Sequence, residues 1–412
     1  MSLLVLGTGG TIKRLSKNFN NSQNFLFKSF GSALKIGVKD FIDNLYAEIT
    51  QGNLGCVDLV MGLTDSSSLI ANLLNLKLGF LSTSFNSLLS CQNKFICRNI
   101  SLKYLPNHTP KFYLLHTKSD VSRAYSFLKN PKNLVFYKPV KGSLSFYSSY
   151  ASSSRQLSDI FLDSKNILKS KNKFYTQILK LAPDSKERDF SLSHINSLLV
   201  EEVIQGTQIT VDGYVDFFGN IGFFGITKSN FLPNTLSFRR FDFPFNFSEK
   251  RDSEIYNVSK ILVQKLHLKR TLFNIEFMVN KNSLKIVEIN PRPSSQFMYL
   301  IHKTMGIHPL VFVLENILPQ PKNYKGYANI FILRKKKDAF AQQVPSKKEL
   351  LFIEKKYNCQ INLFIKKGKY LSDYPQDLYT YRYAEIKIFG KGLKENKDIF
   401  KKIKKELIFK WA

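Results

Sequence analysis

Two acidic residues stand inside two apolar runs between Phe273 and Pro293, in the stretch FNIEFMVNKNSLKIVEINPRP. The runs are rich in Ile, Val and Phe, and the cluster Asn-Lys-Asn-Ser between them is typical of a turn, so the stretch predicts a β-hairpin. Because side chains alternate between the two faces of a strand, a turn centred near Asn282 places Glu276 directly opposite Glu288.

The same alternation predicts which residues share a face with the two carboxylates. In the first run this face is expected to contain Leu272, Asn274, Glu276 and Met278. In the second run it is expected to contain Leu284, Ile286, Glu288 and Asn290. Arg292 follows between two prolines that end the strand.

Two carboxylates that face each other repel, and removing them from water increases the cost. A hard cation between them relieves the repulsion, and Mg²⁺ prefers oxygen ligands and commonly keeps phosphate oxygens among them. The spacing therefore predicts a metal site made of Glu276, Glu288 and Asn290, with Arg292 beside a bound anion. The alternative is an ordinary hairpin with one solvent-facing side, on which Glu and Asn are common.

The ending Glu-x-Asn-Pro-Arg resembles the metal-binding strand of the ATP-grasp superfamily, which includes carboxylate–amine ligases and biotin-carboxylase-like enzymes. Three earlier segments resemble other family motifs in the same order: CQNKFICRNI (91–100), FYKPVKGSLS (136–145) and LLVEEVIQGTQITVDGYV (198–215). The resemblance spans roughly residues 55–310. It implies the ATP-grasp fold, with ATP and Mg²⁺ as cofactors and Mn²⁺ as an alternative metal.

For the phosphates of ATP, the resemblance implies contacts from two lysines, Lys94 and Lys138, which act as flexible point charges. It also implies that Ser143, in the loop after Lys138, donates a hydrogen bond to a phosphate oxygen. This loop has fewer glycines than is usual in the family, which leaves its phosphate contacts open. The alternative for each lysine is an ordinary surface position.

For the nucleoside, the resemblance implies that residues Glu201, Glu202, Val203 and Ile204 contact adenine, partly through the backbone of Val203. Gln208 stands where the family often has Glu, and it can hydrogen-bond a ribose hydroxyl without bringing charge. The alternative for Glu202 is a plain exposed strand residue.

The activity that the resemblance implies is ATP-dependent formation of an amide C–N bond. A carboxylate attacks the γ-phosphate of ATP, an acylphosphate forms, and an amine then displaces phosphate. Lys138 and Arg292 are the expected catalytic residues, because they neutralise charge on the transferring phosphoryl group. The substrates are expected to be a small-molecule carboxylate and an amine, on an amino acid or a cofactor precursor, and their identity stays open.

Three rival functions are weighed against the ligase. An ATP-dependent carboxylase of the biotin-carboxylase type would use bicarbonate as the acid, but no biotin-carrier segment is recognisable. A nucleic-acid binder would explain the net charge of +30 but not the Glu-x-Asn-x-Arg spacing, and nucleic acid is therefore an unlikely partner. A non-catalytic ATP-binding protein would explain the unusual loop around Ser143 but not the complete metal strand.

Composition sets the remaining bounds. The 412 residues, 43% of them apolar, suffice for two or three globular domains. No signal peptide and no bilayer-spanning stretch is recognisable, so no membrane partner is expected. The cysteines show no metal-binding spacing, which favours reduced thiols in a cytoplasmic protein. The family includes dimers, so a homodimer is open.

The expected fold class combines α/β and α+β parts. A doubly wound parallel-sheet domain is expected at 1–90, a two-lobed ATP-grasp domain at 91–315, and a small α+β lobe at 316–412. The ATP-grasp lobes are expected at 91–197 and 198–315.

Four segments carry more specific expectations. LGFLS (78–82) is predicted to be a strand, and YSSYASSSRQLSD (147–159) a mobile loop that is either a lid or a surface insertion. Either Arg239 or Arg240 can bind a substrate carboxylate; the alternative is a basic surface loop. DIFKKIKKELIFKW (398–411) is predicted to be an amphipathic helix.

Overall fold

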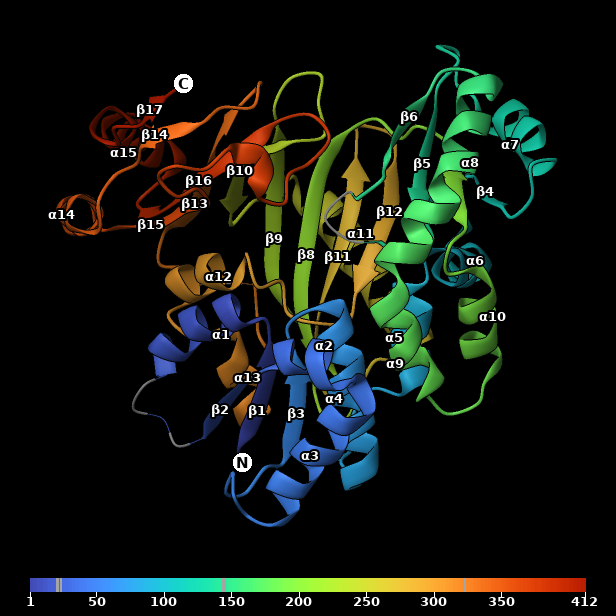
Figure 1. Ribbon diagram of the computed structural model, residues 1–412, viewed down its shortest axis with the longest axis horizontal. Helices are drawn as coiled ribbons and strands as arrows, with labels where there is room; N and C mark the ends of the chain where they lie inside the picture. The colour runs from blue at the N-terminus through green and yellow to red at the C-terminus, as the bar shows by residue number, and fades with distance from the viewer. Residues whose placement is uncertain (20–21, 23, 143–145, 322–323) are drawn as a thin grey trace.

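The computed structural model describes residues 1–19, 22, 24–142, 146–321 and 324–412. Two large antiparallel sheets face each other above a small parallel sheet, and Figure 1 shows the three sheets with their helices. The N-terminal domain lies at the bottom of that view, a four-stranded lid at the upper right, and the C-terminal strands at the upper left. The mixed architecture confirms the predicted fold class.

The N-terminal domain is built on a three-stranded parallel sheet in the order β2-β1-β3. Its strands and helices are β1 (Leu3–Gly7), α1 (Gly9–Ser16), β2 (Phe25–Ser29), α2 (Ala33–Ile36), α3 (Val38–Thr50), β3 (Leu59–Gly62) and α4 (Asp65–Leu78). Leu4 and Leu6 pack against α3 and α4, whereas Leu3 and Val5 pack against α1. Both faces of the sheet are thus covered, which confirms the doubly wound arrangement.

The predicted strand at 78–82 is wrong. Helix α4 ends at Gly79, whose φ of 71° is left-handed, and the chain then runs without regular structure to α5 (Phe85–Gln92). Asn72 donates to the carbonyl of Thr83, and the Thr83 hydroxyl donates to the carbonyl of Lys269. These side-chain bonds hold the segment to α4 and to the central part of the chain.

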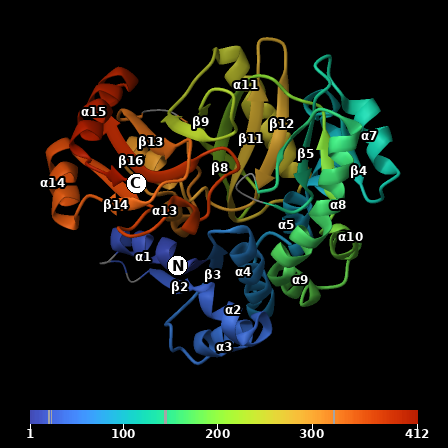
Figure 2. The ribbon, with the colours of Figure 1, turned by 45° about the horizontal axis from the view of Figure 1, so that its top comes forward.

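The lid is a four-stranded antiparallel sheet in the order β4-β7-β5-β6. Its elements are β4 (Phe112–Leu115), α7 (Asp120–Leu128), β5 (Val135–Pro139), β6 (Ser149–Ala151), α8 (Ser154–Lys171), α9 (Lys173–Lys180), α10 (Lys186–His194) and β7 (Leu198–Glu201). Helices α7 and α8 bury their apolar faces against one side of the sheet. The other side faces the central sheet (Figure 2).

The prediction of a mobile loop at 147–159 is also wrong, because this segment forms β6 and the start of α8. Its serines act as helix-capping residues: the Ser153 hydroxyl accepts a hydrogen bond from the amide of Gln156. Leu157 and Phe161 then bury in the lid core. The polar composition thus marks a helix start.

The central sheet has eight strands, all paired antiparallel, in the order β12-β11-β8-β9-β10-β13-β16-β15. The strands are β8 (Thr207–Val215), β9 (Ile221–Phe231), β10 (Phe238–Phe243), β11 (Thr271–Val279), β12 (Leu284–Asn290), β13 (Tyr327–Lys335), β15 (Cys359–Leu363) and β16 (Tyr381–Gly390). The associated helices are α6 (Lys94–Tyr104), α11 (Glu249–Lys265), α12 (Met298–Met305), α13 (Pro309–Glu315), α14 (Lys347–Tyr357) and α15 (Leu393–Glu406). Among the helices in the described ranges, none has the length and apolar character that crossing a bilayer requires.

The C-terminal strands extend the central sheet directly. Phe243 of β10 pairs with Ala328 of β13, so the predicted boundary at residue 316 falls between two hydrogen-bonded strands. The amphipathic helix at 398–411 is confirmed in part: α15 ends at Glu406, and the chain then forms β17 (Lys410–Trp411), which pairs with β14 (Ala341–Gln343). The division into 1–90, 91–315 and 316–412 stays a prediction.

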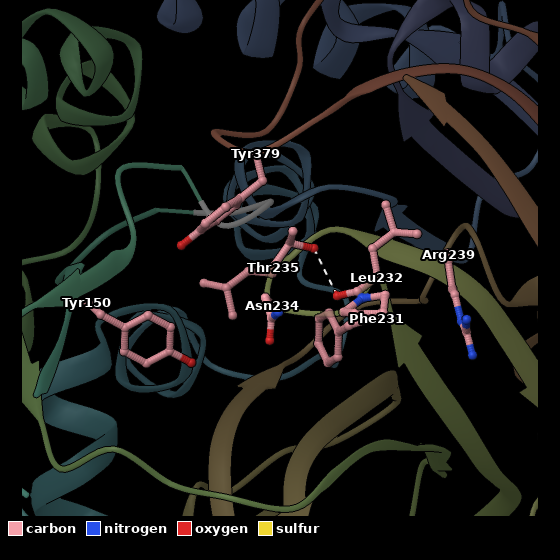
Figure 3. A pocket seen from close by; sticks show the side chains of 9 residues that line it. Tyr150, Phe231, Leu232, Asn234, Thr235, Arg239 and Tyr379 are labelled. Atoms are coloured by element: carbon pink, nitrogen blue, oxygen red, sulfur yellow. Dashed lines mark hydrogen bonds between the residues drawn. The ribbon is translucent and has the colours of Figure 1, made fainter. Parts of the chain in front are cut away.

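A cavity of about 480 Å³ lies where the lid, the β9–β10 connection and the segment before β16 meet (Figure 3). Its walls include Tyr150 from β6, residues 231–236, Arg239, and Tyr379. The Tyr379 hydroxyl lies 2.9 Å from the Ser149 hydroxyl, which ties the lid to the C-terminal part of the chain.

Candidate active site

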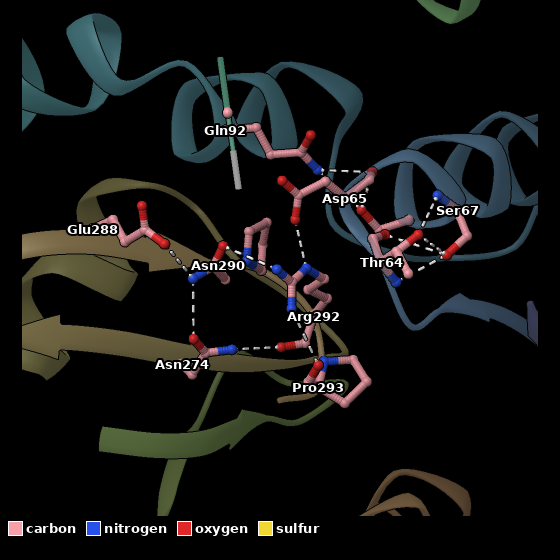
Figure 4. Close-up of polar contacts among 12 residues, drawn as sticks. Thr64, Asp65, Ser67, Gln92, Asn274, Glu288, Asn290, Arg292 and Pro293 are labelled. Atoms are coloured by element: carbon pink, nitrogen blue, oxygen red, sulfur yellow. Dashed lines mark hydrogen bonds and ion pairs between the residues drawn. The ribbon is translucent and has the colours of Figure 1, made fainter. Parts of the chain in front are cut away.

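The hairpin of β11 and β12 places Glu276 opposite Glu288 and Asn274 opposite Asn290, which confirms the predicted pairing of the two carboxylates. The Asn290 amide group donates to Glu288 at 3.2 Å and to Asn274 at 3.1 Å. Figure 4 shows the polar contacts that join Asn274, Asn290 and Glu288.

The predicted face of the second run is wrong in its first half. Phe277 pairs with Ile286, so Val287 is an extra residue that forms a β-bulge. The bulge reverses the alternation, and Leu284 and Ile286 therefore point into the apolar core while Glu288 points into the cleft. The carbonyl of Val287 accepts hydrogen bonds from Arg98 at 2.7 Å and from Lys138 at 3.3 Å.

The two opposed carboxylates have different electrostatic environments. Burial, and then the charge of Glu288, raises the pKa of Glu276 from 4.5 to about 8. Burial would also raise the pKa of Glu288, but Lys94 and Lys138 bring this pKa below its ordinary value. In the metal-free protein one carboxylate of the pair is therefore protonated near neutral pH.

Lys94 is the first residue of α6 and reaches the carboxylate pair. Its ammonium lies 3.5 Å from Glu288 and donates to the carbonyl of Gly142 at 2.6 Å. The preceding residue, Asn93, caps the helix by accepting from the amides of Phe95 and Ile96. Asn93 thereby fixes where α6 begins, and with it the position of Lys94.

Lys138 lies on β5 of the lid and forms a buried ion pair with Glu201 at 2.8 Å. Arg98 binds the other oxygen of Glu201 at 2.6 Å. The side chains of Arg98 and Glu201 are only 2% and 3% exposed. The carboxylate of Glu201 thus binds two cations, whereas the family resemblance implied a contact between Glu201 and adenine. Arg98 was missed because nothing in the helix pattern distinguishes it from a surface arginine.

The chain after β7 crosses from the lid to the central sheet through Glu202, Val203 and Ile204. Glu202 forms two hydrogen bonds with Lys111, the residue before β4: its amide donates to the Lys111 carbonyl, and its carboxylate accepts from the Lys111 amide. The backbone groups of Val203 and Ile204 form no hydrogen bond with any residue that the structure describes. They therefore have free donors and acceptors at the edge of the cleft.

Gln208 lies on β8, on the cleft face. Its amide group donates to Glu276 at 2.8 Å, so it contacts the carboxylate pair directly. Asp212 lies further along the same face and is buried, and one of its oxygens has no partner in the described part of the chain. Burial, and then Glu276, raises the pKa of Asp212 well above its ordinary value. No motif or spacing in the sequence pointed to Asp212.

Arg292 is bound by a carboxylate from the N-terminal domain. Its guanidinium lies 2.5 Å from one oxygen of Asp65 (Figure 4). The ammonium of Lys141 lies 2.6 Å from the other oxygen. Lys141 also donates to Gln92 at 3.0 Å. Asp65 therefore joins Arg292, which follows β12, to Lys141, which follows β5, and sequence reasoning missed it.

Local geometry explains how Asp65 reaches this place. It is the first residue of α4, and Thr64 caps the helix in a box with Ser67. A side chain at Gly62 would collide with the backbone of Ser67 and Ser68, so glycine is required where β3 passes into α4. The Thr-x-x-Ser signal of this cap was present in the sequence.

The remaining predicted residues have separate positions. Ser143 lies outside the described residues. Arg240 pairs with Asp242 at 2.6 Å and is therefore engaged within the fold, whereas Arg239 is exposed and lines the cavity beside the lid.

Taken as a donor set, Glu276, Glu288 and Asn290 suit a hard divalent cation. Within the described ranges no three His, Cys, Asp or Glu side chains gather as a metal site, so a cation here would complete its shell with the amide oxygen, water and ligand oxygens. The flanking cations Lys94, Lys138 and Arg292 can then neutralise an anionic ligand.

Residues 133–299 match the model of the ATP-grasp domain family. This match confirms, for that part of the chain, the resemblance to the ATP-grasp superfamily seen in its motifs. A search of curated protein sequences found no match.

Several solved structures share the fold over the whole chain. One is an L-amino acid ligase from Bacillus licheniformis, with 14% identity, a TM-score of 0.70, and coverage of 100% of this chain and 99% of that one. Another is a biotin carboxylase from Campylobacter jejuni, with 12% identity, a TM-score of 0.67, and coverage of 99% of this chain and 92% of that one. A third is an N5-carboxyaminoimidazole ribonucleotide synthetase from Thermotoga maritima, with 14% identity, a TM-score of 0.63, and coverage of 100% of this chain and 99% of that one.

Proposed function

We propose that this protein is an ATP-dependent ligase that activates a small-molecule carboxylate as an acylphosphate and transfers the acyl group to an amine. The observation that carries the proposal is the opposed pair Glu276 and Glu288, with Lys94 3.5 Å from Glu288. Two buried carboxylates among cations suit a cation–polyphosphate complex such as Mg²⁺ with ATP.

Each residue of the site has a proposed task. Glu276, Glu288 and Asn290 hold Mg²⁺, for which Mn²⁺ is an alternative, and the metal neutralises phosphate oxygens when bound. Lys94 and Lys138 bind phosphate oxygens. Arg292, fixed by Asp65, neutralises charge on the transferring phosphoryl group.

The nucleoside end of ATP is proposed to bind at the crossing between β7 and β8. The free backbone groups of Val203 and Ile204 can hydrogen-bond the edge of adenine, whose donors and acceptors match a peptide backbone. Glu201 acts indirectly in this proposal, because its carboxylate holds Lys138 in place. Gln208 orients Glu276 and remains able to bind a hydroxyl.

The choice of an amide-forming reaction is supported by the Bacillus licheniformis structure, which is an L-amino acid ligase. An amino acid is therefore the proposed type of substrate. Carboxylases share the fold as well, so bicarbonate is the acid that must be tested beside organic acids.

The experiment is Mg²⁺-dependent release of ADP from ATP by the purified protein, with amino acids, other carboxylates and bicarbonate offered singly and in pairs. We expect ADP and phosphate only with a particular acid–amine pair, and none with the Glu288→Ala variant. ADP release with bicarbonate alone would favour a carboxylase. Absence of ATP binding would contradict the proposal.

Metal binding is expected to depend on pH through Glu276. Its pKa of about 8 means that the metal must displace a proton below this pH. We expect the apparent Mg²⁺ affinity to weaken about tenfold for each pH unit below 8. The measurement is the Mg²⁺-induced rise in melting temperature at pH 6 and at pH 8. An equal rise at both values would contradict the assignment.

Without metal, the stability of the folded protein is expected to depend on pH in the opposite direction. The folded protein retains a proton on Glu276 that the unfolded chain releases above its ordinary pKa, so the stability contribution falls as pH rises from 4.5 to about 8. Glu276→Gln should remove both pH dependences, which makes it the control for the two measurements.

Replacing Asp65 by asparagine is expected to impair turnover more than nucleotide binding. Lys141 and Arg292 outweigh burial and hold the pKa of Asp65 well below its usual range, so it is the charged partner of both. Loss of this charge lets Arg292 move, and a displacement of about 1 Å can cost about 100-fold in rate. Steady-state kinetics should show the loss in kcat, with a small change in the KM for ATP.

The matched control for this variant is Asp43→Asn, which removes a half-exposed carboxylate that pairs with Lys39 and Lys77 on the surface. Its effect on kcat should be negligible. An Asp65→Asn enzyme with unchanged kcat would show that Arg292 does not need this partner.

A further inference from the structure

The cavity beside the lid has the size of a small-molecule site. Its volume of about 480 Å³ falls within the range of roughly 300–1,000 Å³ that ligand pockets occupy. Three aromatic rings line it: Tyr150 from β6, Phe231 at the end of β9, and Tyr379 from the segment before β16. Figure 3 shows Tyr150 and Tyr379 on one side of the β9–β10 connection and Arg239 on the other.

On the lid, the cavity adjoins the lysine that is proposed to bind phosphate. Tyr150 of β6 pairs with Phe136 of β5, and residues paired across strands point to the same face. Lys138 is two residues further along β5 and shares this face. The backbone positions of Tyr150 and Lys138 are therefore roughly 8 Å apart.

On the central sheet, the cavity lies near Gln208, which contacts the carboxylate pair. Ser229 of β9 pairs with Gln208, which donates to Glu276. Phe231 is two residues beyond Ser229 on the same face, so it lies roughly 8 Å from the backbone of Gln208. Each wall of the cavity therefore lies one strand and two residues away from a residue of the candidate active site, Lys138 on the lid and Gln208 on the central sheet.

Arg239 is directed by an irregularity of β10. Phe238 pairs with Phe231 and Arg240 pairs with Asn230, so Arg239 is the extra residue of a β-bulge. Bulges change the direction of a side chain and are frequent beside active sites. Arg240 is bound to Asp242, whereas Arg239 forms no ion pair within the part of the chain that the structure describes. Arg239 is therefore a free cation at an aromatic cavity.

We propose that this cavity binds the amine substrate, and that this substrate is an α-amino acid with a large aromatic or apolar side chain. The proposal rests on the ligase function and specifies its acceptor. Arg239 pairs with the carboxylate of the amino acid in two parallel hydrogen bonds. Tyr150, Phe231 and Tyr379 pack against its side chain.

The strand order shows which substrate Arg239 holds. β10 is separated from β11 by β8 and β9, so Arg239 lies about 14 Å across the sheet from the strand of Glu276. The carboxylate that ATP activates must lie at the metal pair. A carboxylate at Arg239 consequently belongs to the other substrate, the amine.

The transfer step balances with this placement. The amino nitrogen forms a C–N bond to the acyl carbon of the acylphosphate, and the bond from that carbon to the phosphate oxygen breaks. Phosphate leaves with one of the two protons that the ammonium group loses, and the other proton goes to solvent. The acceptor keeps its own carboxylate at Arg239 throughout, so the product is a dipeptide-like amide.

The test is isothermal titration calorimetry of the full chain with L-phenylalanine, L-alanine and L-phenylalanine amide. We expect saturable binding of L-phenylalanine, about tenfold weaker binding of L-alanine because it lacks the ring, and about tenfold weaker binding of the amide because it lacks the carboxylate. Arg239→Gln should weaken L-phenylalanine binding about tenfold as well. Arg123→Gln, an exposed arginine on α7, should change nothing.

Three results would overturn the proposal. The first two are no saturable binding of L-phenylalanine and equal L-phenylalanine affinity of wild type and Arg239→Gln. The third is competition between L-phenylalanine and ADP, with Arg239→Gln lowering the affinity for both ligands. The last would assign the cavity to the nucleotide. Binding is measured without turnover, so failure of the ligase function alone would leave L-phenylalanine binding intact. If the enzyme releases ADP with an acceptor and the KM for that acceptor is the same in wild type and Arg239→Gln, this inference is overturned while the ligase function stands.

Discussion

Glu276→Gln is expected to abolish turnover while making the metal-free protein more stable. The glutamine keeps the size of the side chain and an acceptor for Gln208, but it removes one of two opposed carboxylates. ADP release should fall by at least about 1,000-fold, because a metal ligand that neutralises the transferring phosphoryl group is lost.

The gain in stability has a separate cause. Above pH 8 the metal-free native protein holds both carboxylates charged and buried, since the pKa of Glu276 is about 8. Replacing this carboxylate by a neutral amide should raise the free energy of unfolding by on the order of 3 kcal/mol. Urea denaturation in EDTA at pH 8.5 measures this change, with the exposed Glu249→Gln as control. Turnover within tenfold of wild type would contradict the role of Glu276.

Glu201→Ala is expected to destabilise the protein by about 3–5 kcal/mol, because removing one partner of a buried ion pair leaves uncompensated charge. The side chains of Arg98 and Lys138 are only 2% and 5% exposed, and both depend on this carboxylate. Urea denaturation at pH 7 measures the loss. Glu202→Ala, one residue further on, removes an exposed hydrogen bond and a partly exposed ion pair with Lys285 and should cost under about 1.5 kcal/mol.

A double variant separates lost charge balance from lost packing. Arg98→Met together with Glu201→Gln removes one buried cation with its carboxylate, so it should recover part of the stability that Glu201→Ala loses. Equal effects of Glu201→Ala and Glu202→Ala would show that the Arg98–Glu201–Lys138 cluster contributes little, and would favour the direct adenine contact that the sequence suggested for Glu201.

The sequence was most informative where one local rule sufficed. Alternation on both sides of a turn predicted the pairing of Glu276 with Glu288, which the strand register confirms. The same rule failed at Val287, because one inserted residue reverses every later side chain. The carbonyl of Val287 accepts from Arg98 and Lys138, and no local pattern encodes these distant partners.

Residues that reach the site from far along the chain were beyond sequence reasoning. Asp65 and Arg292 are 227 positions apart, and Arg98 and Glu201 are 103 apart. Such ion pairs follow from how the N-terminal domain and α6 dock against the central sheet, which is a property of the assembled core. Residues 147–159 were misassigned for another reason: serine is equally common in loops and at helix caps, and only the buried Leu157 distinguishes the two.

The hydrogen bonds between β10 and β13 limit how this protein can be divided by engineering. Deleting everything after residue 316, or exchanging it for the corresponding part of a relative, would remove the partner of β10 and leave its backbone donors and acceptors open to solvent. An open strand edge of this kind recruits other chains and promotes aggregation. Chimaeras are better joined outside the eight-stranded sheet, for example in the connection after α4, where the exchanged piece carries its own small parallel sheet.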